Sequence, residues 1–285
     1  MRLTSILTLT CSIAALVLSL LCLFAGSSRS FLQSADVMTL NVSQIGQGEI
    51  FNTTSDPDDN FLDDLVNSAQ DVANDLIGDA ADAITERLNI SDFYAVHVMN
   101  YCEGMFEPNG TADNAKKNTT NCSERNALFH FNPSEIIEEH LPSGITLEDL
   151  NWPEDIDRAV DAIRAASIAM FVFWCVGIGF AGFAIIGSAV SIFSSGRGTP
   201  CGVFVVSFIS FLSLGIASAI ATAVMAKATD AINKYGQDIG VSATKGTEFL
   251  GMSWGATAAM LVATILSIAQ VCGGRRDKGF KSSKI

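Results

Sequence analysis

Four long stretches without Asp, Glu, Lys, Arg or His constrain this sequence more than any other feature. They comprise 26 residues between Arg2 and Arg29, 32 between Arg164 and Arg197, 29 between Arg197 and Lys227, and 26 between Glu248 and Arg275. A helix needs about 20 apolar residues to cross the hydrocarbon core of a bilayer. Burial of all four in a soluble core is disfavoured, because only 16% of the residues are charged and could cover them. The sequence therefore predicts an all-α membrane protein with a four-helix transmembrane bundle.

The first stretch has a second interpretation as a cleaved signal peptide. Its apolar run, residues 6–24, is long for a signal sequence, but one Arg precedes it and the letters FAGSS form an acceptable cleavage site. We favour an uncleaved anchor. Either choice leaves the following segment on the same side of the membrane.

The basic residues predict the orientation. The tail after residue 272 carries five basic residues and one Asp, and the link between the second and third stretches adds Arg197. Basic residues favour the cytoplasmic side, so both termini are expected there, in a multi-pass plasma-membrane protein. The expected divisions are 1–26 (N-terminus and first span), 27–164 (acidic glycosylated extracellular loop), 165–194 (second span), 195–200 (cytoplasmic link), 201–226 (third span), 227–249 (short extracellular loop), 250–272 (fourth span) and 273–285 (basic tail).

The two cysteines of the large outer loop predict a disulfide. Cys102 and Cys122 are the only cysteines in residues 27–164, and the other five lie in the spans or at their ends. Thiols outside the cytoplasm oxidise, and a bond closing about twenty residues stabilises a fold by roughly 3 kcal/mol. A metal site is the alternative, but two cysteines supply too few ligands.

Six sequons in the same loop predict N-glycosylation. Each is Asn-x-Ser/Thr without an intervening proline, and they begin at Asn41, Asn52, Asn89, Asn109, Asn118 and Asn121. Asn121 adjoins Cys122, so a disulfide formed early would hinder its modification. Coincidence in an Asn-rich loop is the competing interpretation.

Periodicity predicts several elements within this loop. Residues 55–89 carry apolar residues at helical spacing on one face and acids on the others, which is typical of a long amphipathic helix. Residues 92–102 favour a strand, 127–133 a second short strand, and 134–141 a short helix. Residues 153–171 favour a helix that continues into the second span.

The spans carry small residues and no charged side chains. No ionisable acid, base or histidine lies within them, which argues against a proton-coupled transporter. Small residues every four positions let helix backbones approach closely. They serve either oligomerisation or packing within one bundle, and in the last span they are Gly251, Gly255, Ala259 and Ala263.

No pattern of residues points to catalysis. The sequence contains no recognisable nucleophile–base pair, phosphate-binding glycine loop or metalloprotease helix. We expect a protein that is not an enzyme, with no cofactor, no metal and no nucleic-acid partner.

The C-terminal tail suggests contact with lipid. Cys272 lies at the predicted cytoplasmic end of the fourth span and is a candidate for palmitoylation. Basic residues near an anionic leaflet each gain about 1 kcal/mol, and here they are Arg275, Arg276, Lys278, Lys281 and Lys284. The alternative is that these residues only fix the orientation.

The letters YAVHVMNYCEGMF, followed by NCSERNALFHFNPSEIIEEHLPSGITLEDLNWPEDI, resemble the SUR/PalI family of fungal claudin-like membrane proteins. The order of spans matches over nearly the whole chain. The resemblance implies a small β-sheet in the cysteine-stapled loop beside the amphipathic helix. It also implies a place in static plasma-membrane domains called eisosomes, with roles in cortex, cell wall and endocytosis.

Two departures limit this resemblance. The tail is much shorter than the long tails of the PalI branch, so a tail-borne signalling role is not implied. The claudin Trp-Gly-Leu-Trp arrangement is absent, since Trp152 is the only tryptophan of the large loop.

Two functions follow from the sequence. The first is a structural organiser of the fungal plasma membrane, with membrane lipids, further copies of itself or other cortical membrane proteins as partners. The second is a regulator or subunit of a low-affinity calcium-influx system. Residues 27–164 hold 26 acidic and 7 basic residues, a net charge of −19, which would concentrate cations near the surface. Solubility and spacing from the wall explain that charge equally well.

Overall fold

Four long helices dominate the described part of the chain. The computed structural model describes residues 2–44, 91–110, 115–127, 129, 154–193, 198–235 and 241–279. The helices are α1 (Arg2–Phe24), α6 (Glu154–Phe193), α7 (Gly198–Tyr235) and α8 (Thr247–Gly279). Each contains a stretch long and apolar enough to cross a membrane: Leu3–Phe24, Ala162–Phe193, Gly198–Lys234 and Thr247–Cys272. The prediction of four membrane-spanning helices is confirmed at this level.

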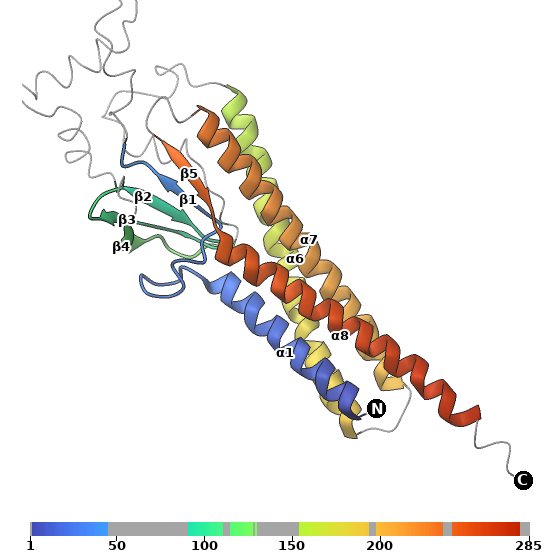
Figure 1. The fold of residues 1–285 in the computed structure, drawn as a ribbon. Coiled ribbons are helices and arrows are strands. Elements are labelled where there is room, and N and C mark those ends of the chain that lie inside the picture. The colour runs from blue at the N-terminus through green and yellow to red at the C-terminus, as the bar shows by residue number, and fades with distance from the viewer. Residues whose placement is uncertain are drawn as a thin grey trace, which may run out of the picture.

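The helices form a ring in which each one packs against two others. α1 lies between α6 and α8, and α7 closes the ring on the opposite side (Figure 1). Large apolar side chains face outward, such as Phe183 and Ile186 of α6, which are 61% and 62% exposed. Such a surface suits contact with lipid chains, which are as apolar as a protein core.

Three helices extend well beyond the spans expected from the sequence. α8 continues to Gly279, where the sequence suggested a tail from residue 273. α6 has 40 residues, or about 60 Å at 1.5 Å per residue, against about 30 Å of hydrocarbon. It begins at Glu154, which confirms that a helix runs continuously into the second span. α7 continues to Tyr235, where the sequence suggested a loop from residue 227. The extension is held because the Asn233 side chain bonds both backbone polar groups of Ala243 on the neighbouring strand.

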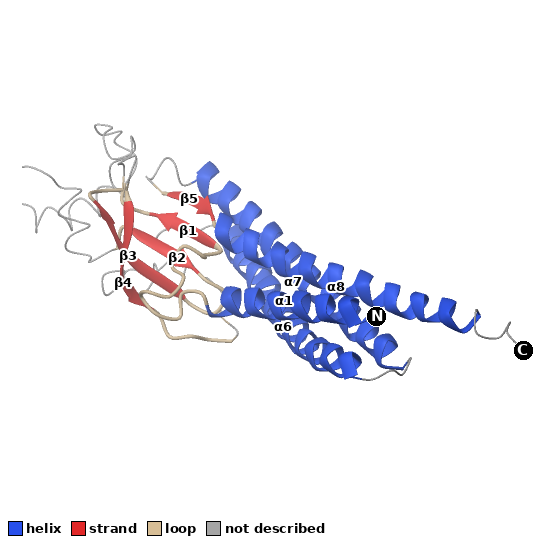
Figure 2. Cartoon of the chain, turned by 60° about the horizontal axis from the view of Figure 1, so that its bottom comes forward, coloured by secondary structure: helices blue, strands red, loops and turns tan. Residues whose placement is uncertain are grey.

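A five-stranded antiparallel sheet covers one end of the bundle (Figures 1 and 2). Its strands are β1 (Met38–Asn41), β2 (Phe93–Val96), β3 (Tyr101–Glu107), β4 (Lys116–Cys122) and β5 (Ser242–Lys245). Their spatial order is β4-β3-β2-β1-β5. β5 precedes α8 and pairs with β1, which follows α1, from Met38 opposite Lys245 to Asn41 opposite Ser242. The small sheet implied by the family resemblance is therefore present, and it includes a strand from the short loop as well.

The strands differ from the sequence predictions in detail. Residues 92–102 do not form one strand, because they contain all of β2 and the first two residues of β3. The turn between them is closed by the His97 amide, which donates to the Asn100 carbonyl at 2.8 Å. Of the second predicted strand, residues 127 and 129 are described and neither is in a strand. The predicted helices at 55–89 and 134–141 lie outside the described residues.

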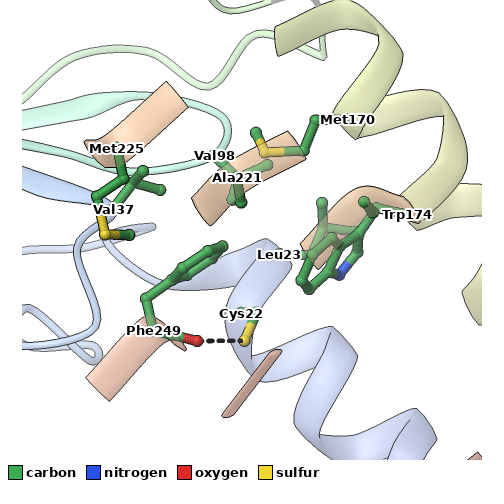
Figure 3. Close-up of a cluster of buried hydrophobic side chains, with 10 residues drawn as sticks. Cys22, Leu23, Val37, Val98, Met170, Trp174, Ala221, Met225 and Phe249 are labelled. Carbon is green, nitrogen blue, oxygen red and sulfur yellow. Dashed lines mark hydrogen bonds between the residues drawn. The ribbon is translucent and has the colours of Figure 1, made fainter. Parts of the chain in front are cut away.

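The core joins all four helices to the sheet. Trp174 of α6 is fully buried, stacks on Phe249 of α8 with ring centroids 5.8 Å apart, and donates its indole N–H to the Ser19 carbonyl of α1 at 2.9 Å. The surrounding buried side chains, most of them drawn in Figure 3, are Cys22, Leu23, Val37, Val98, Met170, Ala217, Ala221 and Met225. Because Val37 and Val98 come from the segments that flank the strands, the sheet and the bundle share this core.

Candidate functional site: the junction between the sheet and the helix bundle

The connection from α1 to the sheet depends on a glycine and a buried asparagine. α1 ends at Phe24, and Gly26 follows with a φ of 70°, a backbone conformation that residues other than glycine rarely adopt. A Cβ at Gly26 would lie 2.2 Å from the His97 ring. The Asn100 amide donates to the Gly26 carbonyl at 2.8 Å, so the end of α1 is fixed to the β2–β3 turn.

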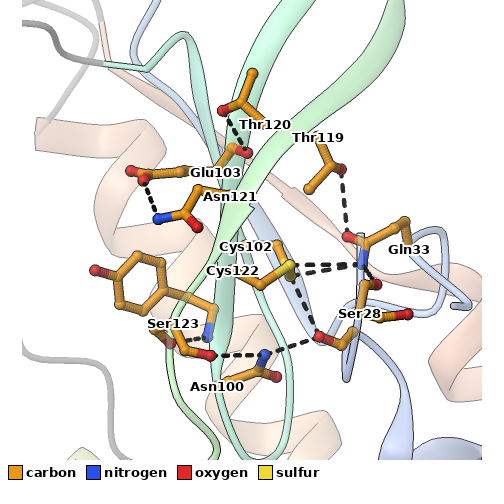
Figure 4. The surroundings of a disulfide bond; sticks show 12 residues. Ser28, Gln33, Asn100, Cys102, Glu103, Thr119, Thr120, Asn121, Cys122 and Ser123 are labelled. Atoms are coloured by element: carbon orange, nitrogen blue, oxygen red, sulfur yellow. Dashed lines mark hydrogen bonds between the residues drawn. A yellow bond between two sulfur atoms is a disulfide. The ribbon is translucent and has the colours of Figure 1, made fainter. Parts of the chain in front are cut away.

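The disulfide staples the other side of this connection. Cys102 and Cys122 are bonded, as the sequence predicted, and the structure places them directly opposite each other on β3 and β4. The Gln33 amide nitrogen lies 3.5 Å from Cys102 Sγ and donates to the Ser28 carbonyl at 2.6 Å (Figure 4). The Thr119 hydroxyl donates to the Gln33 side-chain oxygen at 3.4 Å. The bond therefore holds the segment after α1 as well as two strands.

An ion pair between a partly exposed lysine and a buried aspartate ties β4 to the same segment. Lys117 Nζ lies 3.4 Å from Asp36 Oδ1 and also bonds Thr39 Oγ1, while Thr39 donates to Asp36 Oδ2 at 2.6 Å. The same ammonium lies 5.9 Å from the centre of the Phe93 ring. Because the Asp36 side chain is only 6% exposed, loss of Lys117 would leave a buried charge without its partner.

His97 is the unusual polar group of this junction. It is 2% exposed, and neither ring nitrogen has a hydrogen-bond partner among the described residues. Burial lowers the pKa of His97 below its ordinary value, with the charge of Lys117 acting in the same direction and Asp36 and the nearby backbone of Ala35 opposing it. The imidazole is therefore neutral at neutral pH. No group of three metal-ligating side chains occurs among the residues that the structure describes.

The sequons occupy different surroundings. Asn118 and Asn121 are exposed on β4, and their amides donate to Glu107 at 2.6 Å and to Glu103 at 3.2 Å. Asn41 is half-buried at the end of β1, and its side-chain oxygen accepts from both the amide and the hydroxyl of Ser43. Asn109 is exposed after β3. Asn52 and Asn89 lie outside the described residues.

A β-bulge places two of these sequons on one face. The register shifts between Glu103 and Gly104, so that Asn121 is opposite Glu103 and Asn118 is opposite Met105. Residues opposite each other share a face, and Glu103 and Met105 are two apart on β3. Asn118 and Asn121 therefore lie side by side, although a spacing of three would separate them in a regular strand.

The small residues of the spans divide between packing and open surface. In α8, Gly251 is exposed with open space around it, Gly255 and Ala259 are half-buried, and Ala263 is buried. A repeat of four residues drifts around a helix of 3.6 residues per turn, so only part of the stripe meets the other helices. The buried face of α8 instead follows Ser253, Ala256, Thr257, Met260, Ala263, Thr264 and Ser267.

The predicted palmitoylation site lies at the end of the bundle opposite the sheet. Cys272 is exposed near the end of α8, far from the sheet. The start of α1 lies at the same end (Figure 1). At this end Gln270 of α8 bonds Ser5 and Thr8 of α1, at 3.1 Å each.

Together these features define a class of protein: a four-helix membrane bundle with one disulfide-linked sheet covering one end. The sequence model of the SUR7/PalI family matches residues 4–266. The chain therefore belongs to the SUR7/PalI family, which confirms the resemblance seen in the sequence.

Among curated relatives, the chain is similar to the SUR7 family protein pun1 of Schizosaccharomyces pombe. The two are 24% identical over 277 residues, which cover 92% of this chain and 91% of the relative. No solved structure matches.

Proposed function

We propose that this chain is a non-enzymatic plasma-membrane protein that organises cortical membrane domains of the eisosome type, with consequences for the cell wall and endocytosis. Membership of the SUR7/PalI family supports a shared membrane role. The observation that carries the proposal is the pairing of β5 with β1, which fixes the sheet to α1 and α8 at once. A contact made by the sheet would therefore constrain the lateral position of the helices.

The proposal assigns a side of the membrane to each end. The start of α1 and the end of α8 lie at the same end of the bundle, and the sheet lies at the other end (Figure 2). The basic tail favours the cytoplasm for the end of the bundle that holds the start of α1 and the end of α8. We therefore assign the sheet and its glycans to the extracellular side.

Lipid contact through the tail would retain the protein in such domains. Exposed Cys272 is the proposed palmitoylation site, and the five basic tail residues are the proposed partners of anionic inner-leaflet lipid. Exchange of the five basic residues for Gln, or of Cys272 for Ser, should leave insertion intact but speed lateral diffusion. Unchanged diffusion with intact insertion would restrict the tail to setting orientation.

Self-association is the proposed second route to domains. Gly251 has open space around it on the outer surface of α8, and small residues allow close approach of a helix from another copy or another cortical protein. Gly251→Leu should then reduce crosslinked dimers without lowering the amount of folded protein. Equal crosslinking in both proteins would contradict this route.

Live imaging of a tagged copy in fungal cells tests the organiser role. Stable cortical patches with slow recovery after photobleaching are the expected result. A diffuse or internal-membrane pattern would contradict it.

A role in cation influx is the second candidate, favoured by the net charge of −19 between residues 27 and 164. Reconstituted protein in a planar bilayer distinguishes the two roles. Calcium-dependent conductance would support the influx role, and the organiser role predicts none.

A further inference from the structure

A polar groove lies where the sheet meets the start of α8. Its volume is about 720 Å³, and Leu32 is the only large apolar side chain among the described residues that line it. Both edge strands of the sheet contribute, with Lys116 and Lys117 from β4 and Lys245 from β5. The groove is therefore an open depression lined by both edge strands, by residues of the segment 30–36 and by the start of α8, and it does not belong to the packed core.

Charges of both signs line the groove, and two of them are paired with each other. Lys117 pairs with buried Asp36, whereas Glu248 accepts from the Ser34 hydroxyl at 2.5 Å, a neutral donor that does not cancel the charge of a carboxylate. Lys245 lies 3.3 Å from Asp230, but both side chains are largely exposed, so this pair is weak. The exposed side chain of Lys116 has no hydrogen bond or ion pair with any residue that the structure describes. Among the described lysines of the groove, Lys116 and Lys245 are therefore the two most available to an anion, although Lys245 must exchange its weak pair with Asp230.

The groove lies at the surface of the membrane. The membrane-crossing stretch of α8 begins at Thr247, and Thr247 and Glu248 themselves line the groove. That stretch has 26 residues, about 39 Å at 1.5 Å per residue, so each end reaches a few ångströms past the 30 Å hydrocarbon core. Trp254, about two turns beyond Thr247 along α8, is 45% exposed and donates to Thr222 at 3.2 Å. An exposed tryptophan with a polar partner is typical of the membrane–water interface, which puts the groove at headgroup level.

We propose that this groove binds the phosphate of a glycerophospholipid headgroup from the leaflet on the side of the sheet, with Lys116 and Lys245 as cationic partners. The hydroxyls of Ser30, Thr244 and Thr247 line the same groove and supply neutral donors. Ammonium groups bind phosphate as point charges and need no fixed geometry. The inference requires that the helices span a membrane, but it does not depend on the organiser role.

Native mass spectrometry of the full chain in a neutral detergent tests the proposal. The probes are phosphatidylserine, diacylglycerol as the same chains without a phosphate, and inorganic phosphate as the anion without chains. The variants are Lys116→Gln, Lys245→Gln and the double variant. Lys227→Gln is the matched control, because Lys227 is an exposed lysine on α7 that does not line the groove. A peptide map without reductant checks that the Cys102–Cys122 bond remains in every variant.

We expect one bound phosphatidylserine and no bound diacylglycerol. Each groove variant should weaken binding about tenfold, the effect of 1.4 kcal/mol, and Lys227→Gln should leave it unchanged. Competition by inorganic phosphate at high concentration would support recognition of the phosphate. Equal loss in the control, equal binding of diacylglycerol, or undiminished binding by the double variant would overturn the proposal. Binding of inorganic phosphate without retention of the lipid would overturn the choice of a lipid as ligand.

Discussion

Replacement of Trp174 by Phe should destabilise the helix bundle by about 2 kcal/mol. The indole N–H donates to the Ser19 carbonyl in the core, and a lost hydrogen bond costs about 1 kcal/mol. The smaller ring leaves a cavity of roughly 40 Å³, which at about 24 cal/mol per Å³ costs about 1 kcal/mol more. Trp174 is fully buried and contacts Phe249, so lipid chains cannot fill that cavity.

The matched control is Trp254→Phe. Trp254 also donates an N–H bond, to Thr222, but its side chain is 45% exposed. Lipid or detergent fills the space left by the missing ring, so only the hydrogen-bond cost of up to about 1 kcal/mol remains. Comparison of the two substitutions therefore separates the free-energy cost of the cavity from the cost of the lost hydrogen bond.

The assay is thermal stability in detergent, followed by size-exclusion chromatography of a fluorescent-protein fusion. About 2 kcal/mol should lower Tm by about 4–8 °C for a chain of this size. Trp254→Phe should lower Tm by half of that or less. Equal shifts in the two variants, or no shift in Trp174→Phe, would refute the view that this contact between α1, α6 and α8 holds the bundle.

Three further predictions concern the sheet. Cys102→Ser and Cys122→Ser should cause the same folding or trafficking defect, with the double variant no worse, because one bond is lost each time; additive defects would exclude a shared bond. Because burial lowers the pKa of His97, the unfolded chain binds a proton that the folded chain does not, so Tm should fall as the pH drops below about 6.5. His97→Gln should flatten that decline between pH 6.5 and 5, and an unchanged slope would assign it to other groups. Asn118→Gln should remove one glycan step on gels. Asn121→Gln should change the apparent mass little, because Asn118 lies beside Asn121 on the same face and the disulfide adjoins it. A full step lost in each of the two variants would contradict this prediction.

The sequence alone determined the number of membrane-crossing helices and the disulfide. A bilayer accepts only long apolar segments whose backbone groups are bonded internally, so a stretch such as 165–196 has few alternatives. Cys102 had one partner available outside the spans. The resemblance to the family was also visible in the short sequence motifs around these two cysteines. These conclusions depend on properties that each segment carries by itself.

Tertiary structure decided the sheet and the junction. β4 is the polar run KKNTTNC and β5 is SATK, and neither has the β-branched and aromatic alternation that marks a strand. β4 is held by Lys117 and by a disulfide to β3. β5 forms because α7 and α8 place it beside β1, some two hundred residues earlier in the chain.

Burial of individual side chains also depended on these long-range contacts. His97 could have been an exposed strand residue, but the end of α1 at Gly26 covers it. In α8 the sequence indicated a stripe through Gly251 and Gly255, whereas the packed face runs through Ser253 and Ala256. A helix that is apolar all round does not disclose which face meets protein and which meets lipid, and only the positions of the neighbouring helices settle that choice.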